Sequence, residues 1–344
     1  MSPPGVPRWH HRPVADAEQE RPSELSGGRS RASTGTAPRA RAQLIVGIVP
    51  VTVIAVGLLC VLATSMPAAR APLSGATQTA TAEVVRNGVA PDGRGVEVSY
   101  TDPEGEEQTG VIVLARPEAI PEGAEIGVQY DPAHPETVYA DGDAAHLTVR
   151  NLLFGMFWAG FVLVVCASIT AFRLFSRPRL RRREATTATA RRVRVRRGLS
   201  DRSWLVLDHG GAVSWVPVYW DEAVSSLRRD TPITVHGNPR RDRLVLPVID
   251  GHSIWPSGGR RGSAPKGEAT QPPPQDPAPR RGLLRQVRGD AAGLLFAPLF
   301  GLLWAYTDES GVSGFLAATA LSAAVLFWLP SIFGSDPTGP HDDE

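Results

Sequence analysis

The sequence contains almost no lysine and almost no cysteine. Lys266 is the only lysine, and all other Lys+Arg residues are arginine. This excess of arginine, with abundant alanine, glycine and proline, is typical of a high-GC bacterial genome. The two cysteines, Cys60 and Cys166, both lie inside apolar runs, which excludes a disulfide framework in the polar segments. We expect each cysteine to behave as a small buried hydrophobe.

The sequence also lacks the recurring motifs of catalytic chemistry. It contains no glycine-rich phosphate loop, no nucleophile elbow and no cluster of metal ligands. Ser203, His209 and Asp221 could be combined into a hydrolase triad, but the elbow motif that would support one is missing. Asp141 and Asp143 are similar to the start of a calcium loop whose later ligands are absent. We therefore predict a protein that is not an enzyme and needs no metal or cofactor.

Four apolar runs without charged residues predict membrane-spanning helices. About twenty such residues are needed to cross roughly 30 Å of hydrocarbon. The predicted spans are residues 42–66, residues 152–172 and a hairpin of two helices at residues 291–333. The first run is longer than the apolar region of a signal peptide and lies far from the start of the sequence. We therefore expect an uncleaved anchor, in which Pro50 is tolerated.

The positions of arginine predict the orientation of these helices. Arginines lie before the first span, after the second and before the third: Arg29, Arg31, Arg39, Arg41, Arg173, Arg177, Arg179, Arg181, Arg182, Arg183, Arg280, Arg281, Arg285 and Arg288. Residues 67–151, between the first two spans, are instead rich in acids. Positive residues flank membrane helices on the cytoplasmic side. The sequence thus predicts a multi-pass plasma-membrane protein with both termini in the cytoplasm and residues 67–151 outside.

Two polar segments have the alternating pattern of β-strands. Residues 67–151 and residues 173–257 contain short alternating stretches separated by turns of Pro, Gly, Asp and Asn. Three stretches of the first segment recur in the second at offsets of about 106 to 108 residues, which favours duplication of a helix-plus-β-module unit. The predicted fold is therefore a multi-pass α-helical membrane protein with two small all-β modules, each similar to a barrel or a sandwich.

Three further segments have no periodic pattern. Residues 1–41 are rich in Pro, Ser, Gly and Arg and are expected to be a disordered cytoplasmic arm. Its Trp9-His10-His11 has too few ligands for a metal site. Residues 258–290 are predicted to be a Pro/Gly/Arg-rich linker, and residues 334–344 an acidic tail.

Two short motifs in the first β module resemble those of a known family. The motifs are YTDPEG at residues 100–105 and YDPAHP at residues 130–135. They resemble a bacterial, actinobacterial-type membrane-protein family known only as a domain of unknown function. The resemblance covers residues 79–140, and more weakly the second module, which lacks the tyrosine and reads HGNP at residues 236–239. It implies a small β domain flanked by transmembrane helices and brings no activity and no functional residues with it.

The most basic stretch of the chain follows the second predicted span. Residues 173–197 carry eleven arginines and a single acid, Glu184. Such a stretch could bind anionic lipid or nucleic acid, or could only fix the orientation of the helix. We favour orientation combined with contact to anionic lipid at the cytoplasmic face, and we expect no nucleic acid as a partner. The residues predicted to contact lipid are Arg173, Arg177, Arg179, Arg181, Arg182 and Arg183.

The end of this stretch and the tryptophans that follow predict how the second module packs. Arg192, Arg194 and Arg196 alternate with Val193 and Val195, so we expect these arginines on the solvent face of a strand. Core packing is expected for the tryptophans of the module, with a peptide-stacking or base-stacking surface as the alternative. These tryptophans are Trp204, Trp215, Trp220 and Trp255.

These patterns favour a non-enzymatic integral membrane protein of the cell envelope that scaffolds or regulates an unknown protein partner. The alternative is a signal-relay or transport accessory protein that senses an extracytoplasmic ligand. A membrane-bound hydrolase would require Ser203 or His209 for activity. A transporter is not expected, because the spans contain no internal charged residue that would mark a pathway.

Overall fold

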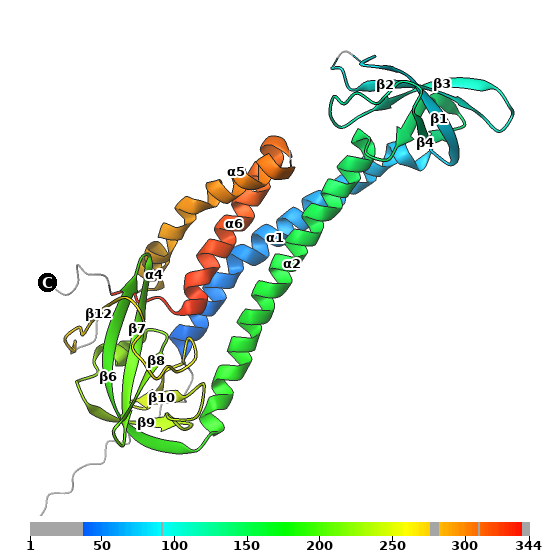
Figure 1. The fold of residues 1–344 in the computed structure, drawn as a ribbon. Helices are drawn as coiled ribbons and strands as arrows, with labels where there is room; N and C mark the ends of the chain where they lie inside the picture. Colours follow the sequence, from blue (N-terminus) through cyan, green and yellow to red (C-terminus); the bar gives the residue numbers. More distant parts are fainter. Residues whose placement is uncertain (1–36, 91, 276–281, 309, 339–344) are drawn as a thin grey trace, which may run out of the picture.

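In the computed structural model, two β domains lie at opposite ends of a bundle of helices (Figure 1). The structure describes residues 37–90, 92–275, 282–308 and 310–338. Parts of the predicted arm, linker and acidic tail, including Trp9-His10-His11, lie outside the described residues. The predicted combination of long apolar helices with two β modules is confirmed, and one of the modules is a closed barrel.

The two longest helices extend well beyond the apolar runs that predict them. α1 (Pro38–Ser74) has 37 residues and α2 (Ala144–Arg179) has 36. At 1.5 Å per residue each is about 55 Å long, more than the roughly 30 Å of a hydrocarbon core. α1 continues because its flanks are rich in alanine, the best helix former. α2 begins early because Asp143 caps it by accepting a hydrogen bond from the His146 N–H.

The last part of the chain forms a helical hairpin. α4 (Leu283–Asp290), the 3₁₀ helix η2 (Ala291–Phe296) and α5 (Ala297–Asp308) lead to α6 (Gly311–Phe333). Pro298 lies at the start of α5, where its missing N–H costs little. Among the described residues, four helical stretches are long and apolar enough to cross a membrane: Arg39–Ser74, Ala144–Arg182, Arg285–Asp308 and Gly311–Phe333.

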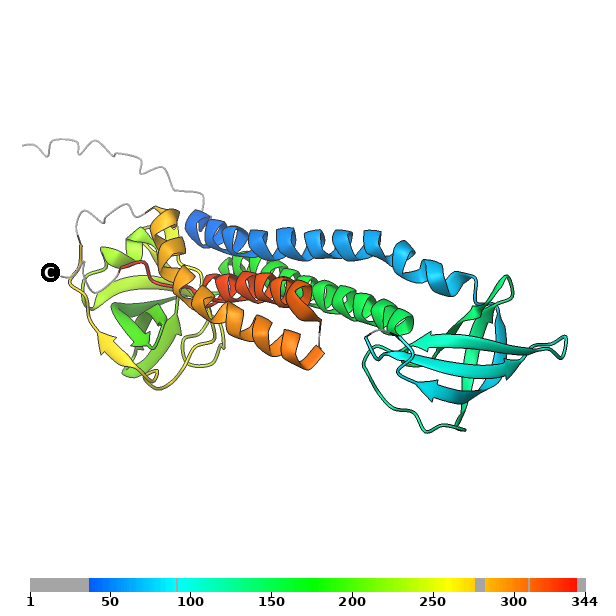
Figure 2. The same ribbon diagram turned by 90° about the horizontal axis from the view of Figure 1, so that it is seen from above.

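The helices of the bundle pack against one another in pairs. α2 and α6 pack against α1, and α5 packs against α6 (Figure 2). At the α5–α6 contact, a Cβ on Gly301 would overlap the side chain of Thr319, so only glycine allows this close approach. Trp328 Nε1 in α6 donates a hydrogen bond to Thr170 Oγ1 in α2 at 3.0 Å. The helices therefore form one packed unit.

Both cysteines are free thiols. Cys166 on α2 is buried, as expected from its position in an apolar run. Cys60 is exposed, which corrects the expectation that both would be buried. The reason is that the long α1 helix has more surface than its neighbouring helices cover.

The N-terminal β domain is a closed barrel of five strands. These are β1 (Gln78–Asn87), β2 (Gly95–Thr101), β3 (Glu107–Val113), β4 (Glu125–Asp131) and β5 (His134–Ala140). Their order is β1-β2-β3-β5-β4, and the barrel closes where β3 runs parallel to β5. Alternate residues such as Val98 and Tyr100 fill its core, and Tyr100 Oη donates a hydrogen bond to the Pro135 carbonyl at 2.8 Å.

The C-terminal β domain is an open sheet. Its strands are β6 (Ala185–Arg197), β7 (Ser200–His209), β8 (Ala212–Pro217), β9 (Thr231–His236), β10 (Leu246–Ile249), β11 (His252–Ser253) and β12 (Glu268–Thr270). The order is β11-β10-β9-β6-β7-β8, and β12 pairs with residues near the C-terminal end of β6. Leu205, Leu207 and Val235 belong to its main core. The short helices η1 (Leu180–Arg182) and α3 (Glu222–Ser225) complete the domain.

The two β domains share one strand plan. In the first, β1 lies between β4 and β2, with β3 and β5 beyond; in the second, β6 lies between β9 and β7, with β8 and β10 beyond. Asp131 Oδ1 accepts from the Ala133 N–H at 2.9 Å in the turn after β4. Asn238 Oδ1 accepts from the Arg240 N–H at 2.8 Å in the turn after β9. This is the turn chemistry expected of Asp and Asn, and the shared plan supports the duplication hypothesis.

Candidate functional site at the helix–sheet junction

The C-terminal β domain is joined to the ends of three helices at a site that we name the junction. It consists of the first residues of α1, the last turns of α2 and α6, residues 334–338 and the strands β6 and β7. Gly334 ends α6 in the left-handed conformation, with φ of 75°. The chain then crosses β7, where the Asp336 N–H donates a hydrogen bond to the Asp201 carbonyl at 2.9 Å. Residues 334–338 thereby become part of the β domain.

A buried ion pair fastens this segment to the sheet. Arg192 Nη2 lies 2.8 Å from Asp336 Oδ2, and the two side chains are 4% and 0% exposed. The same carboxylate accepts hydrogen bonds from Ser203 Oγ and from the Thr338 N–H. Burial alone would raise the pKa of Asp336, but the charge of Arg192 and these hydrogen bonds together hold it below its usual range. The carboxylate is therefore ionised at neutral pH, with both oxygens paired.

The expectation that alternating arginines of β6 line a solvent face is wrong for two of them. Arg192 and Arg194 are only 6% and 5% exposed, whereas Arg196 is exposed. The two buried arginines share a side of β6 with Ala190, which belongs to the main core. Residues 334–338 cover this side, and Arg194 Nη1 donates a hydrogen bond to the Thr338 carbonyl at 2.7 Å. An alternating pattern does not show that a distant segment covers the charged face.

The Ser335 hydroxyl contacts α1 and connects one further helix, α4, to the junction. Its hydroxyl accepts hydrogen bonds from Gln43 Nε2 of α1 at 3.1 Å and from Gln286 Nε2 of α4 at 3.0 Å. It donates to Asp290 Oδ2 at 2.9 Å. One hydroxyl thus uses its single donor and both acceptor positions to hold α1, α4 and the chain after α6 together.

Arg173 connects α2 to both the sheet and α6. Its Nη1 donates to Tyr219 Oη at 3.0 Å, to the Ser257 carbonyl at 2.8 Å and to the Ile332 carbonyl. Tyr219 Oη itself donates to the Ile332 carbonyl at 3.0 Å. Burial raises the pKa of Tyr219, although nearby arginines act in the opposite direction, so the hydroxyl keeps its proton. The end of α2 is thereby fixed to the end of α6.

The structure distributes the six arginines that were predicted to contact lipid over different environments. Arg173 and Arg177 lie in the junction, and Arg177 is 5% exposed. Arg183 Nη1 lies 3.0 Å from Asp242 Oδ2 in the C-terminal β domain. The remaining three are exposed: Arg179, Arg181 and Arg182. Lipid contact stays a prediction for all six.

The first arginines of α1 pack against two buried tryptophans. The guanidinium carbon of Arg39 lies 4.1 Å from the ring centroid of Trp220, and that of Arg41 lies 5.5 Å from Trp255. Both rings are buried, as core packing predicts. Cation–π contacts of this kind are worth about 0.5 to 2 kcal/mol each, depending on desolvation. They hold the beginning of α1 on the same β domain.

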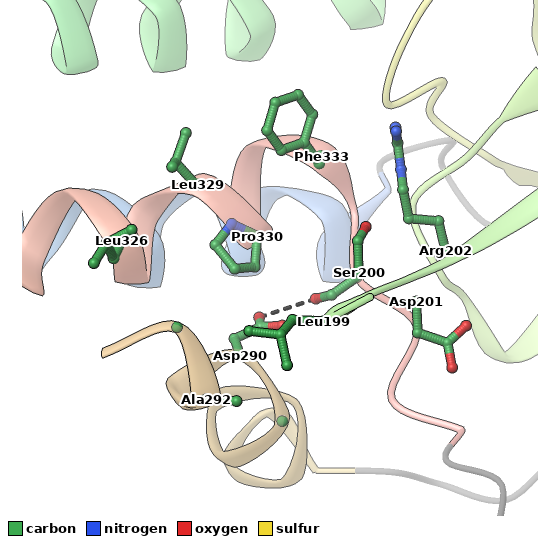
Figure 3. A pocket seen from close by; sticks show the side chains of 13 residues that line it. Leu199, Ser200, Asp201, Arg202, Asp290, Ala292, Leu326, Leu329, Pro330 and Phe333 are labelled. Carbon is green, nitrogen blue, oxygen red and sulfur yellow. Dashed lines mark hydrogen bonds between the residues drawn. The ribbon is translucent and has the colours of Figure 1, made fainter. Parts of the chain in front are cut away.

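A small cavity opens beside the junction (Figure 3). It has a volume of about 200 Å³ and lies between the β6–β7 turn, η2 and the end of α6. Leu326 and Leu329 form an apolar wall, and Asp201, Asp290 and Arg202 contribute polar groups. Burial raises the pKa of Asp201 to about 6 and lowers the pKa of Arg202 to about 10. The volume is below that of typical cofactor pockets, which are about 300 Å³ or larger.

The three residues considered for a hydrolase triad do not contact one another. Ser203 Oγ donates to Asp336, His209 lies near the far end of the same strand, and Asp221 caps α3 by accepting from the Ala223 N–H at 3.1 Å. Within the described ranges, no group of three or more His, Cys, Asp or Glu side chains is placed to hold a metal ion. The geometry therefore gives these residues structural roles.

Sequence reasoning missed the acceptors of the junction, namely Tyr219, Ser335 and Asp336. The only signal was weak: Asp336 is the first acid after the last apolar run, close to a glycine that ends a helix. No family model, curated protein or solved structure matches the chain. The function of the protein is therefore inferred from its own geometry.

Proposed function

We propose that the four apolar helices cross a bacterial plasma membrane, with the N-terminal barrel outside and the C-terminal β domain and both termini in the cytoplasm. α1 and α2 each run from one β domain to the other, so helices that cross a membrane would leave the domains on opposite sides. The arginines near the C-terminal β domain and the acids of the barrel segment support this orientation. Membership of the family of unknown function is proposed on the motif at residues 130–135, which forms the β4–β5 turn.

The function that this architecture supports best is non-enzymatic scaffolding or regulation of a protein partner in the cell envelope. The observation that carries the proposal is the pair of β domains held at opposite ends of the same two helices. The C-terminal β domain is additionally bound to α1 through Arg39, to α2 through Arg173, and to the chain that follows α6 through the Arg192–Asp336 pair. Such an arrangement fixes two protein-binding surfaces at defined positions on either side of a bilayer.

A signal relay is the second candidate, and the junction gives a specific reason to consider it. α1 and α2 enter the barrel directly, and their opposite ends bind the C-terminal β domain through Arg39 and Arg173. A ligand that changes the spacing of the two helices at the barrel would therefore move the tryptophan-rich domain. Under this alternative, a ligand of the barrel changes the fluorescence of Trp204 or Trp215.

The scaffold proposal is tested by gentle detergent extraction of the tagged protein from its native membrane, followed by mass spectrometry. We expect a protein partner that is recovered reproducibly and is lost when residues 78–140 or residues 185–256 are replaced by a flexible linker. Recovery of the protein alone, or with lipid only, would contradict scaffolding and favour the relay.

A further inference from the structure

The cavity beside the junction is lined by a carboxylate that has no cationic partner. Asp290 ends α4, at the point where η2 and the end of α6 border the cavity. Its Oδ2 accepts a hydrogen bond from Ser335 Oγ at 2.9 Å, and within the described ranges no basic side chain pairs with it. The Asp290 side chain is half-buried, so water screens its charge only in part. A cation in the cavity would compensate this charge.

The other charged side chains that line the cavity already have partners. Asp201 Oδ2 lies 3.4 Å from Arg194 Nε. The guanidinium carbon of Arg202 lies 5.4 Å from the ring centroid of Phe333. Figure 3 shows that the Arg202 side chain extends away from Asp290. The charge that is left for a ligand of the cavity is therefore the negative charge of Asp290.

The wall and the rim of the cavity are apolar. Leu326, Leu329 and Pro330 of α6 form the wall. Leu199, in the two-residue turn between β6 and β7, is 68% exposed, and Phe333, at the end of α6, is 47% exposed. Exposed apolar side chains around a polar cavity are typical of sites for ligands that have both a polar and an apolar part. A small soluble cation would explain Asp290 but not this rim.

The cavity lies at the level where the helices leave the predicted membrane. The last turn of α6 and the start of the third predicted span, at residue 291, both border it. Figure 1 shows that the β6–β7 hairpin reaches from the C-terminal β domain to α4. In the proposed orientation, Leu199 and Phe333 lie at the cytoplasmic boundary between acyl chains and headgroups. The ligand that fits this position is a lipid of the cytoplasmic leaflet.

We propose that the cavity binds the headgroup of a phospholipid that carries a primary ammonium group, such as phosphatidylethanolamine. The ammonium lies at Asp290, and the acyl chains lie against Leu199 and Phe333. A primary ammonium offers three N–H donors and a full positive charge to a carboxylate. The volume of about 200 Å³ is below that of cofactor pockets, which suits a small headgroup whose acyl chains remain in the membrane. The inference rests on the membrane orientation proposed above, and the site is separate from the exposed arginines at residues 179, 181 and 182.

The test measures how phosphatidylethanolamine stabilises the purified full-length protein in dodecyl maltoside micelles. The thermal unfolding midpoint, followed against lipid concentration, gives the affinity. We expect Asp290→Asn to weaken binding by about tenfold, since the ammonium loses its counter-ion. The asparagine oxygen can still accept the hydrogen bond from Ser335. The matched control is Asp250→Asn, which removes an exposed acid in the turn after β10 and should weaken binding by less than about twofold.

Three other ligands and a second variant test the chemistry of the site. In phosphatidylcholine three methyl groups replace the N–H donors, and phosphatidylglycerol has no cation, so both should bind about fivefold more weakly or worse. Soluble phosphoethanolamine, which lacks acyl chains, should stabilise the protein far less than the lipid does. Ala292→Leu enlarges a side chain of the cavity lining and should weaken phosphatidylethanolamine binding by about fivefold, which keeps the test valid if Asp290→Asn does not fold.

The proposal is overturned if either folded variant of the cavity binds phosphatidylethanolamine as tightly as the wild type, or if Asp250→Asn loses as much affinity as Asp290→Asn. It is also overturned if phosphatidylcholine, phosphatidylglycerol or phosphoethanolamine stabilises the wild-type protein equally well. Any of these results, obtained while the helices still insert in the expected orientation, would refute the lipid site and leave the membrane topology intact.

Discussion

Asp336→Asn is expected to destabilise the C-terminal β domain by about 3 to 5 kcal/mol, because it leaves Arg192 charged and buried without its counter-ion. Arg192 Nη2 lies 2.8 Å from Asp336 Oδ2, and the side chains of Arg192 and Asp336 are 4% and 0% exposed. Hydrogen exchange of the β6 and β7 amides in the detergent-solubilised protein measures this free energy locally. We expect faster exchange in both strands and release of residues 334–338 from the sheet.

The matched control is Asp242→Asn in the same domain. Asp242 pairs with Arg183 at 3.0 Å, but the two side chains are 36% and 43% exposed. Water screens such a pair, so the loss should be at most about 1 kcal/mol. Equal effects of the two substitutions would contradict a special role for the Arg192–Asp336 pair.

The same pair gives a defined dependence on pH. The pKa of Asp336 is held below its usual range in the folded protein. A carboxyl with a depressed pKa stabilises the fold at pH values above its unfolded pKa of about 3.9, and the contribution is lost as the pH falls through the folded pKa. The difference between wild type and Asp336→Asn should therefore be constant near neutral pH and shrink in acid.

Gly110→Val is expected to prevent closure of the N-terminal barrel. A Cβ at Gly110 would overlap a methyl group of Val138 and would lie 3.3 Å from the carbonyl oxygens of Pro135 and Glu136. Because the two carbonyl oxygens are backbone atoms of β5, this strand would have to move away from β3. Overpacking of this kind costs about 1 to 3 kcal/mol and sometimes more, and we expect the upper end of that range.

Gly127→Val is the control, since Gly127 lies in β4 of the same barrel and an added Cβ meets no atom within 4 Å. Valine favours strands, so this change should be neutral or slightly stabilising. Limited proteolysis of the barrel compares the two variants. Protection that is equal in both would show that the β3–β5 contact does not close the barrel.

The strands and helices of this protein could largely be predicted from short-range patterns. Tyr100 and Val98 alternate with polar neighbours in β2, and Asp131 and Pro132 form the turn after β4. These features depend on residues close in sequence, so a period of two or a turn residue is enough to predict them. The ends of α1 were harder to predict, because an alanine-rich flank continues a helix without continuing an apolar run.

The junction could not be predicted in the same way. Arg192 meets Asp336, which lies 144 positions later in the chain. Alternation places Arg192 and Arg194 on one side of β6, but only the fold shows that residues 334–338 cover that side. Arg173 presents a similar case, because an arginine that flanks an apolar run can orient a helix, contact lipid or bind another domain.

The proposed function requires the two β domains to lie on opposite sides of a membrane. The direct measurement labels single cysteines in protoplasts or spheroplasts with a membrane-impermeant thiol reagent, after both native cysteines have been replaced by alanine. Thr101→Cys tests the exposed end of β2 in the barrel, and Arg229→Cys tests an exposed loop of the C-terminal β domain. We expect labelling of Thr101→Cys in intact preparations and labelling of Arg229→Cys only after lysis. Labelling of both positions, or of neither, before lysis would contradict the account.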